Sequence, residues 1–326
     1  MTTNPAIAAP ARRRTILFLL AILALLAAVL TWQTARAAGS TEIRIGWQKG
    51  SDLAVIKARG AFENTLKQRG IAVQWVEFPA GPQMLEALNV GGVDLGVVGE
   101  TPPVFAQAAN AGLLYVGAEP SAPLAEALLV PKSSTIRSLA DLKGKRVVLN
   151  RGSNVHYLLV QLLAKAHLNY GDIKVAYLAP SDAFAAFQRG DADAWAIWDP
   201  YAAAAIHQLG ARVLADATGV ANNYQFYIAA RSFAQARPGV LKSVIAEVNE
   251  ESLWVGQHPK EAARILAAQT GLPPGVVERA LGHYRYGVVP VDAAIVASQQ
   301  RIADTFYRLK LIPKPIDVAS AVWHPA

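Results

Sequence analysis

The chain of 326 residues contains no cysteine. This absence excludes disulfide bonds, a metal site built from thiolates and a lipid anchor attached to cysteine. The length fits one large domain or two medium domains. A chain of this size buries enough apolar surface to be stable without disulfides.

The sequence also lacks the patterns of several catalytic and cofactor sites. The six histidines are scattered and form no HExxH pair, and the chain has no GxSxG, GxxxxGKS/T or GxGxxG motif. No nucleophile has a plausible general base nearby in the sequence. We therefore expect a protein that is not an enzyme, holds no metal and uses no cofactor.

Acidic residues are absent from residues 1–38, which carry four of the 31 lysines and arginines. The rest of the chain has 27 basic and 24 acidic residues, so its formal charge is only +3 (27 minus 24). It contains no basic block and no basic stripe interleaved with aromatic residues. Nucleic acid is therefore not an expected partner, whereas a small anionic ligand is compatible with this charge.

The first 38 residues have the pattern of a secretory signal peptide. The basic stretch ARRR at 11–14 precedes an apolar run at 15–30 and a small-x-small cleavage site at 35–37. A single membrane anchor is the alternative, but the run is shorter than the roughly 20 residues that span a bilayer. We expect an exported protein.

Strand-like and helix-like segments alternate from residue 40 onward. Strands are expected at 43–47, 73–78, 93–98 and 113–117, with a helix at 53–70 and helices starting at Gly81-Pro82 and Thr101-Pro102. The alternation returns with strands at 146–149, 173–178 and 194–198, and helices at 155–167, from Ser181 or Asp182 to Gly190, and from Asp199-Pro200. This alternation predicts mostly parallel sheets with helices on both faces.

The second part of this pattern repeats the first. A shift of 99 residues places Gly91 on Gly190, Asp94 on Asp193 and Glu100 on Asp199. The corner KGSD at 49–52 also corresponds to the corner RGSN at 151–154. The ordered recurrence of whole corners predicts two similar α/β lobes.

Two extended segments, 126–131 and 225–231, flank the second lobe and are the expected crossings between the lobes. The chain would form the first part of lobe 1 at 39–125, lobe 2 at 132–224, and a mainly helical completion of lobe 1 at 232–326. Two crossings make a hinge that closes a cleft. Tyr227 lies on the second crossing and has two possible roles: its hydroxyl reaches the cleft, or its ring packs within the hinge.

The corners that follow the strands are candidates for an anion site. They meet beyond the carboxyl ends of the strands, and each begins a helix whose first N–H groups have no intrahelical partner. The helix dipole adds a partial positive charge there. Small residues that let the backbone approach a ligand are Gly50, Gly81, Gly99 and Gly152. Side chains that add hydroxyl or amide donors are Gln48, Ser51, Gln83, Thr101, Ser153 and Asn154.

Several of these corner residues also have simpler structural roles. Four corner residues occupy positions typical of ordinary helix N-caps: Asp52, Thr101, Asn154 and Asp199. Trp198, the last residue of its strand, would form an apolar wall of the cleft, whereas Trp195 fits core packing. Glu100 and Asp199 are unfavourable beside an anion unless they cap a helix, hold the hinge or meet a cationic part of the ligand.

Four stretches resemble a known family: IRIGWQKG, WVEFPAGPQMLEALNVGGVDLG, TPPVFAQAA and AAFQRGDADAWAIWDPY. They resemble the periplasmic aliphatic sulfonate-binding proteins of ATP-driven (ABC) importers, and the similarity extends over residues 41–324. The resemblance implies a two-lobed periplasmic binding protein fold of type II, joined by a two-strand hinge. It also implies a monomer in the periplasm that delivers its ligand to a membrane permease without catalysis or a cofactor.

The resemblance assigns ligand binding to residues in the matching motifs, namely Gln48, Gln83, Thr101, Gly152, Ser153, Asn154, Trp198 and Asp199. Glu100 and Tyr227 are further candidates. Two corners depart from the family pattern, because VVGETPP replaces a more polar STGD start and RGSNVH replaces a serine-richer corner. Three hypotheses stay open. The first is a sulfonate receptor. The second is a receptor for taurine, nitrate or a sulfate ester, in which Glu100 or Asp199 could hold an ammonium group of the ligand, and the third is an enzyme similar to the pyrimidine-synthesising relatives.

Overall fold

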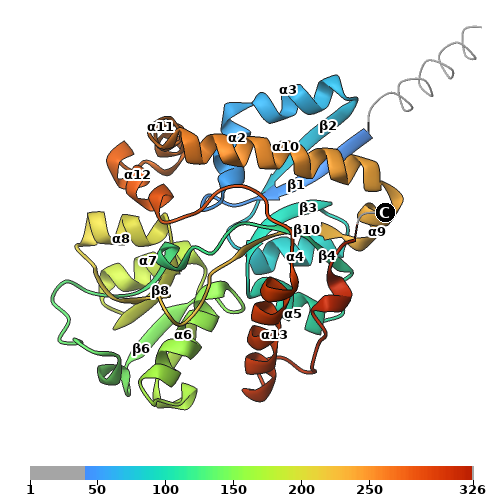
Figure 1. Cartoon of the computed structure of the whole chain (residues 1–326). Coiled ribbons are helices and arrows are strands. Elements are labelled where there is room, and N and C mark those ends of the chain that lie inside the picture. The colour runs from blue at the N-terminus through green and yellow to red at the C-terminus, as the bar shows by residue number, and fades with distance from the viewer. Residues whose placement is uncertain (1–40, 325–326) are drawn as a thin grey trace, which may run out of the picture.

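The computed structural model describes residues 41–324. Two mixed sheets, each of five strands and flanked by helices, form two lobes (Figure 1). Lobe 1 contains sheet A and lobe 2 contains sheet B. The predicted α/β fold with two lobes is therefore confirmed, whereas the predicted signal peptide lies outside the described residues.

Sheet A has the strand order β2-β1-β3-β10-β4. β1 pairs in parallel with β2 and β3, and β10 runs antiparallel between β3 and β4. The strands are β1 (Thr41–Trp47), β2 (Ile71–Glu77), β3 (Leu95–Gly99), β4 (Leu113–Ala118) and β10 (Gln225–Ala230).

Sheet B has the strand order β7-β6-β8-β5-β9. β6 pairs in parallel with β7 and β8, and β5 runs antiparallel between β8 and β9. The strands are β5 (Glu126–Val130), β6 (Arg146–Leu149), β7 (Lys174–Tyr177), β8 (Ala194–Trp198) and β9 (Arg212–Asp216). Each sheet places its antiparallel strand in the fourth position, so the two lobes share one topology.

Most helices belong to lobe 1. Its helices are α2 (Asp52–Arg59), α3 (Ala61–Gln68), α4 (Gly81–Asn89), α5 (Pro102–Ala108), α9 (Arg231–Ala236), α10 (Pro238–Gln257), α11 (Pro259–Thr270), α12 (Pro274–Gly282) and α13 (Ala293–Arg308). The helices of lobe 2 are α6 (Asn154–Lys165), α7 (Pro180–Arg189) and α8 (Tyr201–Leu209). Short 3-10 helices are η1 (Pro123–Ala125), η2 (Leu139–Leu142), η3 (Tyr170–Asp172) and η4 (Ala319–Ala321).

The C-terminal helices complete lobe 1 and reach lobe 2. The long helix α10 packs on α2 and α3, and α13 packs beside α5 (Figure 1). Helix α12 contacts α8 of lobe 2. The mainly helical segment after β10 therefore covers lobe 1 and also contributes to the contact between the lobes.

Both lobes contain the same arginine–aspartate clamp. The backbone N–H and guanidinium of Arg44 at β1 donate to the Asp94 carboxylate just before β3. Arg146 at β6 donates in the same way to Asp193 just before β8. Asp94 and Asp193 are one of the predicted repeat pairs, so the structure gives that repeat a physical basis. Each clamp joins the second and third strands in the order of its sheet with charge-assisted hydrogen bonds.

The single helix predicted at 53–70 is wrong, because the structure has two helices there. α2 ends and α3 begins at Gly60, whose φ of 72° is left-handed. A left-handed residue closes one helix, and glycine adopts this conformation without the strain that a side chain brings. The Gly60 amide donates to the Ile56 carbonyl and completes the last turn of α2.

The two segments predicted as crossings are inner strands of the sheets. β5 lies between β8 and β9, and β10 lies between β3 and β4. The chain therefore passes between the lobes just before each strand, at 119–125 and 217–224. The extended pattern of 126–131 and 225–231 was a correct signal for strands, but only pairing partners show to which sheet a strand belongs.

Helix starts differ from the predicted caps at several corners. The N-cap residues are Ser51 for α2, Ser153 for α6, Ala179 for α7 and Pro200 for α8. Asp52 and Asn154 are therefore first helical residues rather than caps. Thr101 is the N-cap of α5 as predicted, but its side chain makes no capping hydrogen bond.

Each lobe has its own apolar core. Strand β8 is buried over its whole length, and Trp195 on this strand is fully buried against Phe184 and Phe187. Burying one large apolar side chain contributes roughly 1.5–3 kcal/mol. Trp195 is therefore a core residue as expected, and Trp198 at the end of the strand remains available for the space between the lobes.

Candidate ligand-binding site

The corners of both lobes meet at one enclosed cavity. Its lining residues are Gln48, Gly50, Ser51, Gly81, Gly99, Pro102, Ser153, Asn154, Trp198, Gln225 and Tyr284. The cavity volume is about 20 Å³, which is room for about one water molecule. Corners that are far apart in the sequence thus share a common hollow, as the sequence predicts.

Helix N-termini provide the positive potential at this cavity. α2, α4 and α6 begin beside it, and the first N–H groups of a helix have no intrahelical acceptor. Within residues 41–324, no lysine or arginine lines this cavity. The predicted corner at Thr101 adds less, because Pro102 and Pro103 have no N–H to offer.

Two serines occupy matching positions at the cavity, one in each lobe. The Ser51 hydroxyl donates to the Gln48 carbonyl at 2.8 Å, and the Ser153 hydroxyl donates to the Asn150 carbonyl at 2.7 Å. The Gln48 side-chain amide donates to the Val97 carbonyl at 2.9 Å. A ligand oxygen that binds these donors must compete with a backbone carbonyl, and a hydroxyl makes that exchange by rotation about one bond.

Glycines allow the lobes to touch at the cavity. A Cβ atom on Gly50 of lobe 1 would lie 2.6 Å from the Asp199 carbonyl oxygen of lobe 2. A Cβ atom on Gly99 would lie 2.4 Å from Asn154 Oδ1. Any side chain at either position would hold the lobes apart, so these glycines serve close approach between lobes.

Trp198 forms one wall of the cavity, as its position at the end of β8 predicts. Its exposed fraction is 8%, and its ring meets Tyr201 edge-on with 6.2 Å between ring centroids. Its indole lies beside Gly50, the glycine that approaches lobe 2. The site therefore combines amide and hydroxyl donors with one large apolar surface.

Asn154 lines the cavity, but its side-chain amide is committed to the protein. It donates to Glu126 Oε2 at 2.9 Å and to Asn223 Oδ1 at 2.8 Å. Asn223 belongs to the second passage between lobes, so Asn154 ties α6 to that passage. The side chain is better placed to hold the corner than to donate to a ligand.

Gly152 and Gln83 lie at a second, wider hollow next to the cavity. The Gly152 amide donates to His156 Nδ1 at 3.3 Å, so it is directed into lobe 2. Burial, together with the nearby Arg151, lowers the pKa of His156 to about 3, so the imidazole is neutral at physiological pH. The Gln83 side-chain oxygen has no hydrogen-bond partner among residues 41–324.

The structure does not bring Glu100 to the cavity. Its side chain is fully buried and accepts a hydrogen bond from the Tyr224 amide at 3.0 Å. Burial raises the pKa of Glu100 from 4.5 to about 7, against the lowering effect of backbone donors. The neighbouring Thr101 is also fully buried, and its hydroxyl has no partner among the described residues.

Tyr227 is likewise buried away from the cavity. Its hydroxyl lies 2.7 Å from Asp52 Oδ2 and 3.2 Å from Glu119 Oε1. Burial raises the pKa of both carboxyl groups, so they are held toward the neutral form. Of the two predicted roles of Tyr227, the structure supports packing next to the crossing.

Asp199 joins the two lobes on the outer side of the cavity. Its Oδ2 lies 2.7 Å from His283 Nδ1, and its carbonyl accepts from the Tyr284 hydroxyl at 3.0 Å. The hydrogen bond to Asp199 raises the pKa of His283. Asp199 Oδ1 accepts from the Ala203 amide at 3.0 Å, which holds the first turn of α8. His283 and Tyr284 carry no motif, so no sequence signal predicted this contact.

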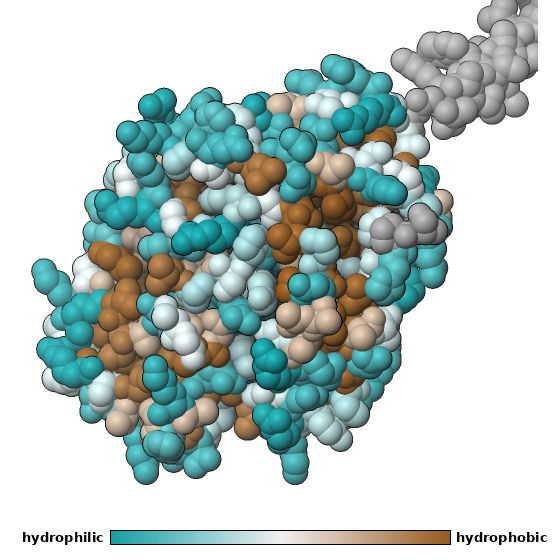
Figure 2. All heavy atoms as spheres, in the orientation of Figure 1, coloured by the Kyte–Doolittle hydropathy of each residue, from teal (hydrophilic) through white to brown (hydrophobic). Residues whose placement is uncertain are grey.

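The Asp199–His283 contact borders an apolar hollow of about 480 Å³ between α8 and α12. Ile206 and Val213 line it and are among the exposed large apolar side chains. Figure 2 shows apolar residues gathered at this edge of lobe 2. The Asp199 side chain is only 4% exposed, so its end of the contact is shielded from water, whereas the His283 side chain is 40% exposed.

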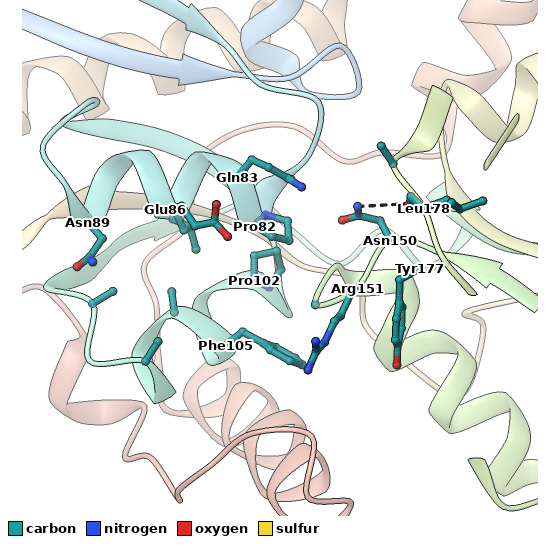
Figure 3. A pocket seen from close by; sticks show the side chains of 16 residues that line it. Pro82, Gln83, Glu86, Asn89, Pro102, Phe105, Asn150, Arg151, Tyr177 and Leu178 are labelled. Carbon is teal, nitrogen blue, oxygen red and sulfur yellow. Dashed lines mark hydrogen bonds between the residues drawn. The ribbon is translucent and has the colours of Figure 1, made fainter. Parts of the chain in front are cut away.

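The wider hollow has a volume of about 530 Å³ and lies between α4 and α5 of lobe 1 and the β6–α6 corner of lobe 2 (Figure 3). Its lining includes Phe105 from lobe 1 and Arg151 and Tyr177 from lobe 2. No motif predicted a site role for these three residues. The RGSN corner was a partial signal, since Arg151 opens it.

None of the helices within residues 41–324 combines the length and the apolar character of a membrane span. The same residues contain no group of three or more histidine or acidic side chains placed to hold a metal ion.

The fold and the cavity between lobes define a two-lobed solute-binding protein. The chain matches the model of the NMT1/THI5-like family over residues 64–262. It is 44% identical over 305 residues to the "Putative aliphatic sulfonates-binding protein" of Escherichia coli (strain K12), across 93% of this chain and 95% of that protein. It is 28% identical over 252 residues to the taurine-binding periplasmic protein of the same strain, across 74% and 76% of the two chains.

A solved structure agrees with these relatives. The alkanesulfonate-binding protein from Xanthomonas axonopodis pv. citri, bound to MOPS, superposes with a TM-score of 0.82 at 44% identity, covering 87% of this chain and 98% of that chain. The protein therefore belongs to the NMT1/THI5-like family and, within it, to the aliphatic sulfonate-binding proteins. These relatives are solute-binding proteins rather than enzymes, and the same holds for this chain.

Proposed function

We propose that the protein captures aliphatic sulfonates between its lobes in the periplasm and delivers them to the permease of an ABC importer. The observation that carries this proposal is the enclosed cavity, which receives helix N-termini from both lobes and, in the part of the chain that the structure describes, no basic side chain. The Xanthomonas protein, at 44% identity, was solved with MOPS, a molecule whose acidic group is a sulfonate.

A sulfonate suits this arrangement because it stays anionic at every physiological pH. Its three oxygens accept hydrogen bonds from helix N-termini and hydroxyls, and no proton transfer is needed. We assign the headgroup to Ser51, Ser153 and the first turns of α2 and α6, with Gln48 as a further donor. Trp198 covers the carbon next to the sulfur.

The size of the cavity implies motion of the lobes. A volume of about 20 Å³ is smaller than a sulfonate headgroup needs. The lobes must therefore separate to admit the ligand, with the passages at 119–125 and 217–224 as the hinge. Asp199, with His283 and Tyr284, holds the closed arrangement, while Glu100 and Tyr227 are buried next to the crossings and do not contact the ligand.

The remaining expectations about partners belong to the same proposal. We propose that the protein acts as a monomer, that residues 1–38 direct its export, and that it has no nucleic-acid partner. The charge of +3 over the rest of the chain is too small to favour a polyanion (27 minus 24).

Taurine is the second candidate, because a taurine-binding protein is among the relatives. Its ammonium group would need a carboxylate at the cavity. Glu100 is buried elsewhere, and Asp199 already pairs with His283. We therefore expect taurine to bind more weakly than ethanesulfonate, its analogue without the ammonium group.

The test is isothermal titration calorimetry of the mature protein with methane-, ethane- and octanesulfonate, taurine, nitrate and sulfate. We expect saturable binding of the alkanesulfonates. Absence of binding for the whole series would refute the proposal. An assay for sulfite released from the bound sulfonates tests the enzyme alternative, and we expect none.

A further inference from the structure

The wider hollow adjoins the enclosed cavity. Pro102 lines both, and neighbouring residues of the same corners divide between them: Ser153 faces the cavity and Gly152 the hollow. A ligand whose headgroup enters the cavity therefore has its tail in the hollow. A volume of about 530 Å³ is far more than a short alkyl chain requires.

The hollow has two aromatic walls, one from each lobe. The Phe105 ring on α5 is fixed by an edge-on contact with Phe306, with 5.0 Å between centroids. The Tyr177 hydroxyl lies 3.0 Å from that of Tyr170, which lies 2.9 Å from His156 Nε2. Both rings are thus held before a ligand arrives, and preorganised aromatic walls suit a flat or cyclic group.

Among the described residues, Arg151 is the one basic residue that lines the hollow. Its side chain extends from the lobe 2 corner toward Phe105 and beside Tyr177 (Figure 3). The guanidinium lies 5.6 Å from the centroid of the Tyr177 ring. No carboxylate pairs with it among residues 41–324. A planar cation with five free donors is suited to bind a carboxylate or sulfonate.

The opposite wall has the other charge. Glu86 and Asn89 line the hollow from α4, across from Arg151 and Tyr177 (Figure 3). An acidic group on the tail would be repelled by Glu86 and attracted by Arg151. The charges on the two walls therefore orient the tail as well as select it.

We propose that Arg151 selects sulfonates whose tail carries a ring and a second acidic group on the far side of that ring. The ring packs between Phe105 and Tyr177, and the acidic group pairs with the Arg151 guanidinium. This inference rests on the proposed function, because it places the sulfonate itself in the enclosed cavity.

Calorimetry with three ligands tests the inference: ethanesulfonate, benzenesulfonate and 4-sulfobenzoate, which adds a carboxylate opposite the sulfonate. We expect the wild-type protein to prefer 4-sulfobenzoate over benzenesulfonate. In Arg151→Gln the ratio of these two affinities should fall about fivefold, the upper range for an exposed ion pair. Lys143→Gln, which removes an exposed charge from the same lobe, is the matched control and should leave the ratio unchanged.

A second variant tests the aromatic wall. Tyr177→Ala should weaken benzenesulfonate by about threefold to tenfold relative to ethanesulfonate, as expected for the loss of one aromatic contact. Two results would overturn the inference: equal affinity of the wild-type protein for the two aromatic ligands, or an unchanged affinity ratio in Arg151→Gln. In either case, binding of ethanesulfonate would still uphold the proposed function. Failure of ethanesulfonate itself to bind would refute the proposed function and the inference with it.

Discussion

The corner that follows the third strand in sheet order, β3 in lobe 1 and β8 in lobe 2, has different roles in the two lobes, although the lobes share one topology. In lobe 1, Glu100 after β3 is fully buried and accepts from the Tyr224 amide at the second crossing. In lobe 2, Asp199 after β8 pairs with His283 from the helical completion of lobe 1. The repeat places a carboxylate at the same corner of each lobe. The elements that pack against that corner determine the partner and the role of the carboxylate.

The largest expected effect is a pH-dependent change in the free energy of unfolding, which should appear when Glu100 is replaced but not when Asp199 is replaced. Burial raises the pKa of Glu100 to about 7 from 4.5, so its neutral form stabilises the fold fully below pH 4.5. That contribution is lost as the pH rises through about 7. Glu100→Gln should therefore raise the free energy of unfolding at pH 8 by up to about 3 kcal/mol, and by less than about 1 kcal/mol at pH 5.

Urea denaturation at both pH values measures this difference, and the glutamine side-chain oxygen still accepts from Tyr224. Asp199→Asn is the matched variant in lobe 2 and should give no such gain. An equal gain from Glu100→Gln at pH 5 and pH 8 would show that the buried charge is not the cause.

The next effect tests whether the two lobes contribute alike to the headgroup. Ser51→Ala and Ser153→Ala should each weaken ethanesulfonate binding by about 1.5–3 kcal/mol, the value of a hydrogen bond to a charged group. Calorimetry measures the affinities, and thermal unfolding without ligand provides the control. If Ser153→Ala leaves the affinity unchanged, its hydroxyl only stabilises the corner through the Asn150 carbonyl.

Closure of the lobes should be sensitive to one methyl group. Gly50→Ala places a carbon 2.6 Å from the Asp199 carbonyl, so it should weaken ligand binding by about 1–3 kcal/mol through steric overlap. Gly112→Ala is the control, because a Cβ atom there meets no atom within 4 Å. Small-angle scattering with ligand should show Gly50→Ala to be more open than the wild type. A closed, tightly binding Gly50→Ala variant would contradict the described contact.

The smallest effect concerns the Asp199–His283 pair. Because the pKa of His283 is raised, the charged pair is fully present below pH 6.5 and is lost as the pH rises through the higher folded value. Asp216 adds to this effect and Arg285 opposes it. His283→Gln should lower ligand affinity at pH 6 by only about 0.5 kcal/mol, because the pair is partly exposed, and should have less effect at pH 9. If the ligand affinity of His283→Gln depends on pH in the same way as that of the wild-type protein, His283 has no role in closing the lobes.

Local sequence signals predicted much of the fold and the existence of the site. Glycine and proline marked the corners, and the alternation of strands and helices indicated two lobes. The sequence did not show that Gly60 divides a helix, because the apolar pattern continues across it. It also did not show that 126–131 and 225–231 are inner strands, since pairing depends on distant residues.

The individual site residues were harder to predict, because their roles depend on what lies opposite them. Gln48, Ser153 and Trp198 face the cavity since their corners point there. Asn154 follows the same corner, yet its amide is used by Glu126 and Asn223. Tyr284 reaches the cavity from a helical region that carries no motif.

The placement of β10 has a consequence for biogenesis. All five strands of sheet B lie between residues 126 and 216, so lobe 2 is a continuous piece of chain. Sheet A receives its fourth strand only at residues 225–230, after lobe 2 has been made. Until that strand inserts, β3 and β4 have unsatisfied edges, so the half synthesised first is the half that finishes last and the one most exposed to mispairing during synthesis.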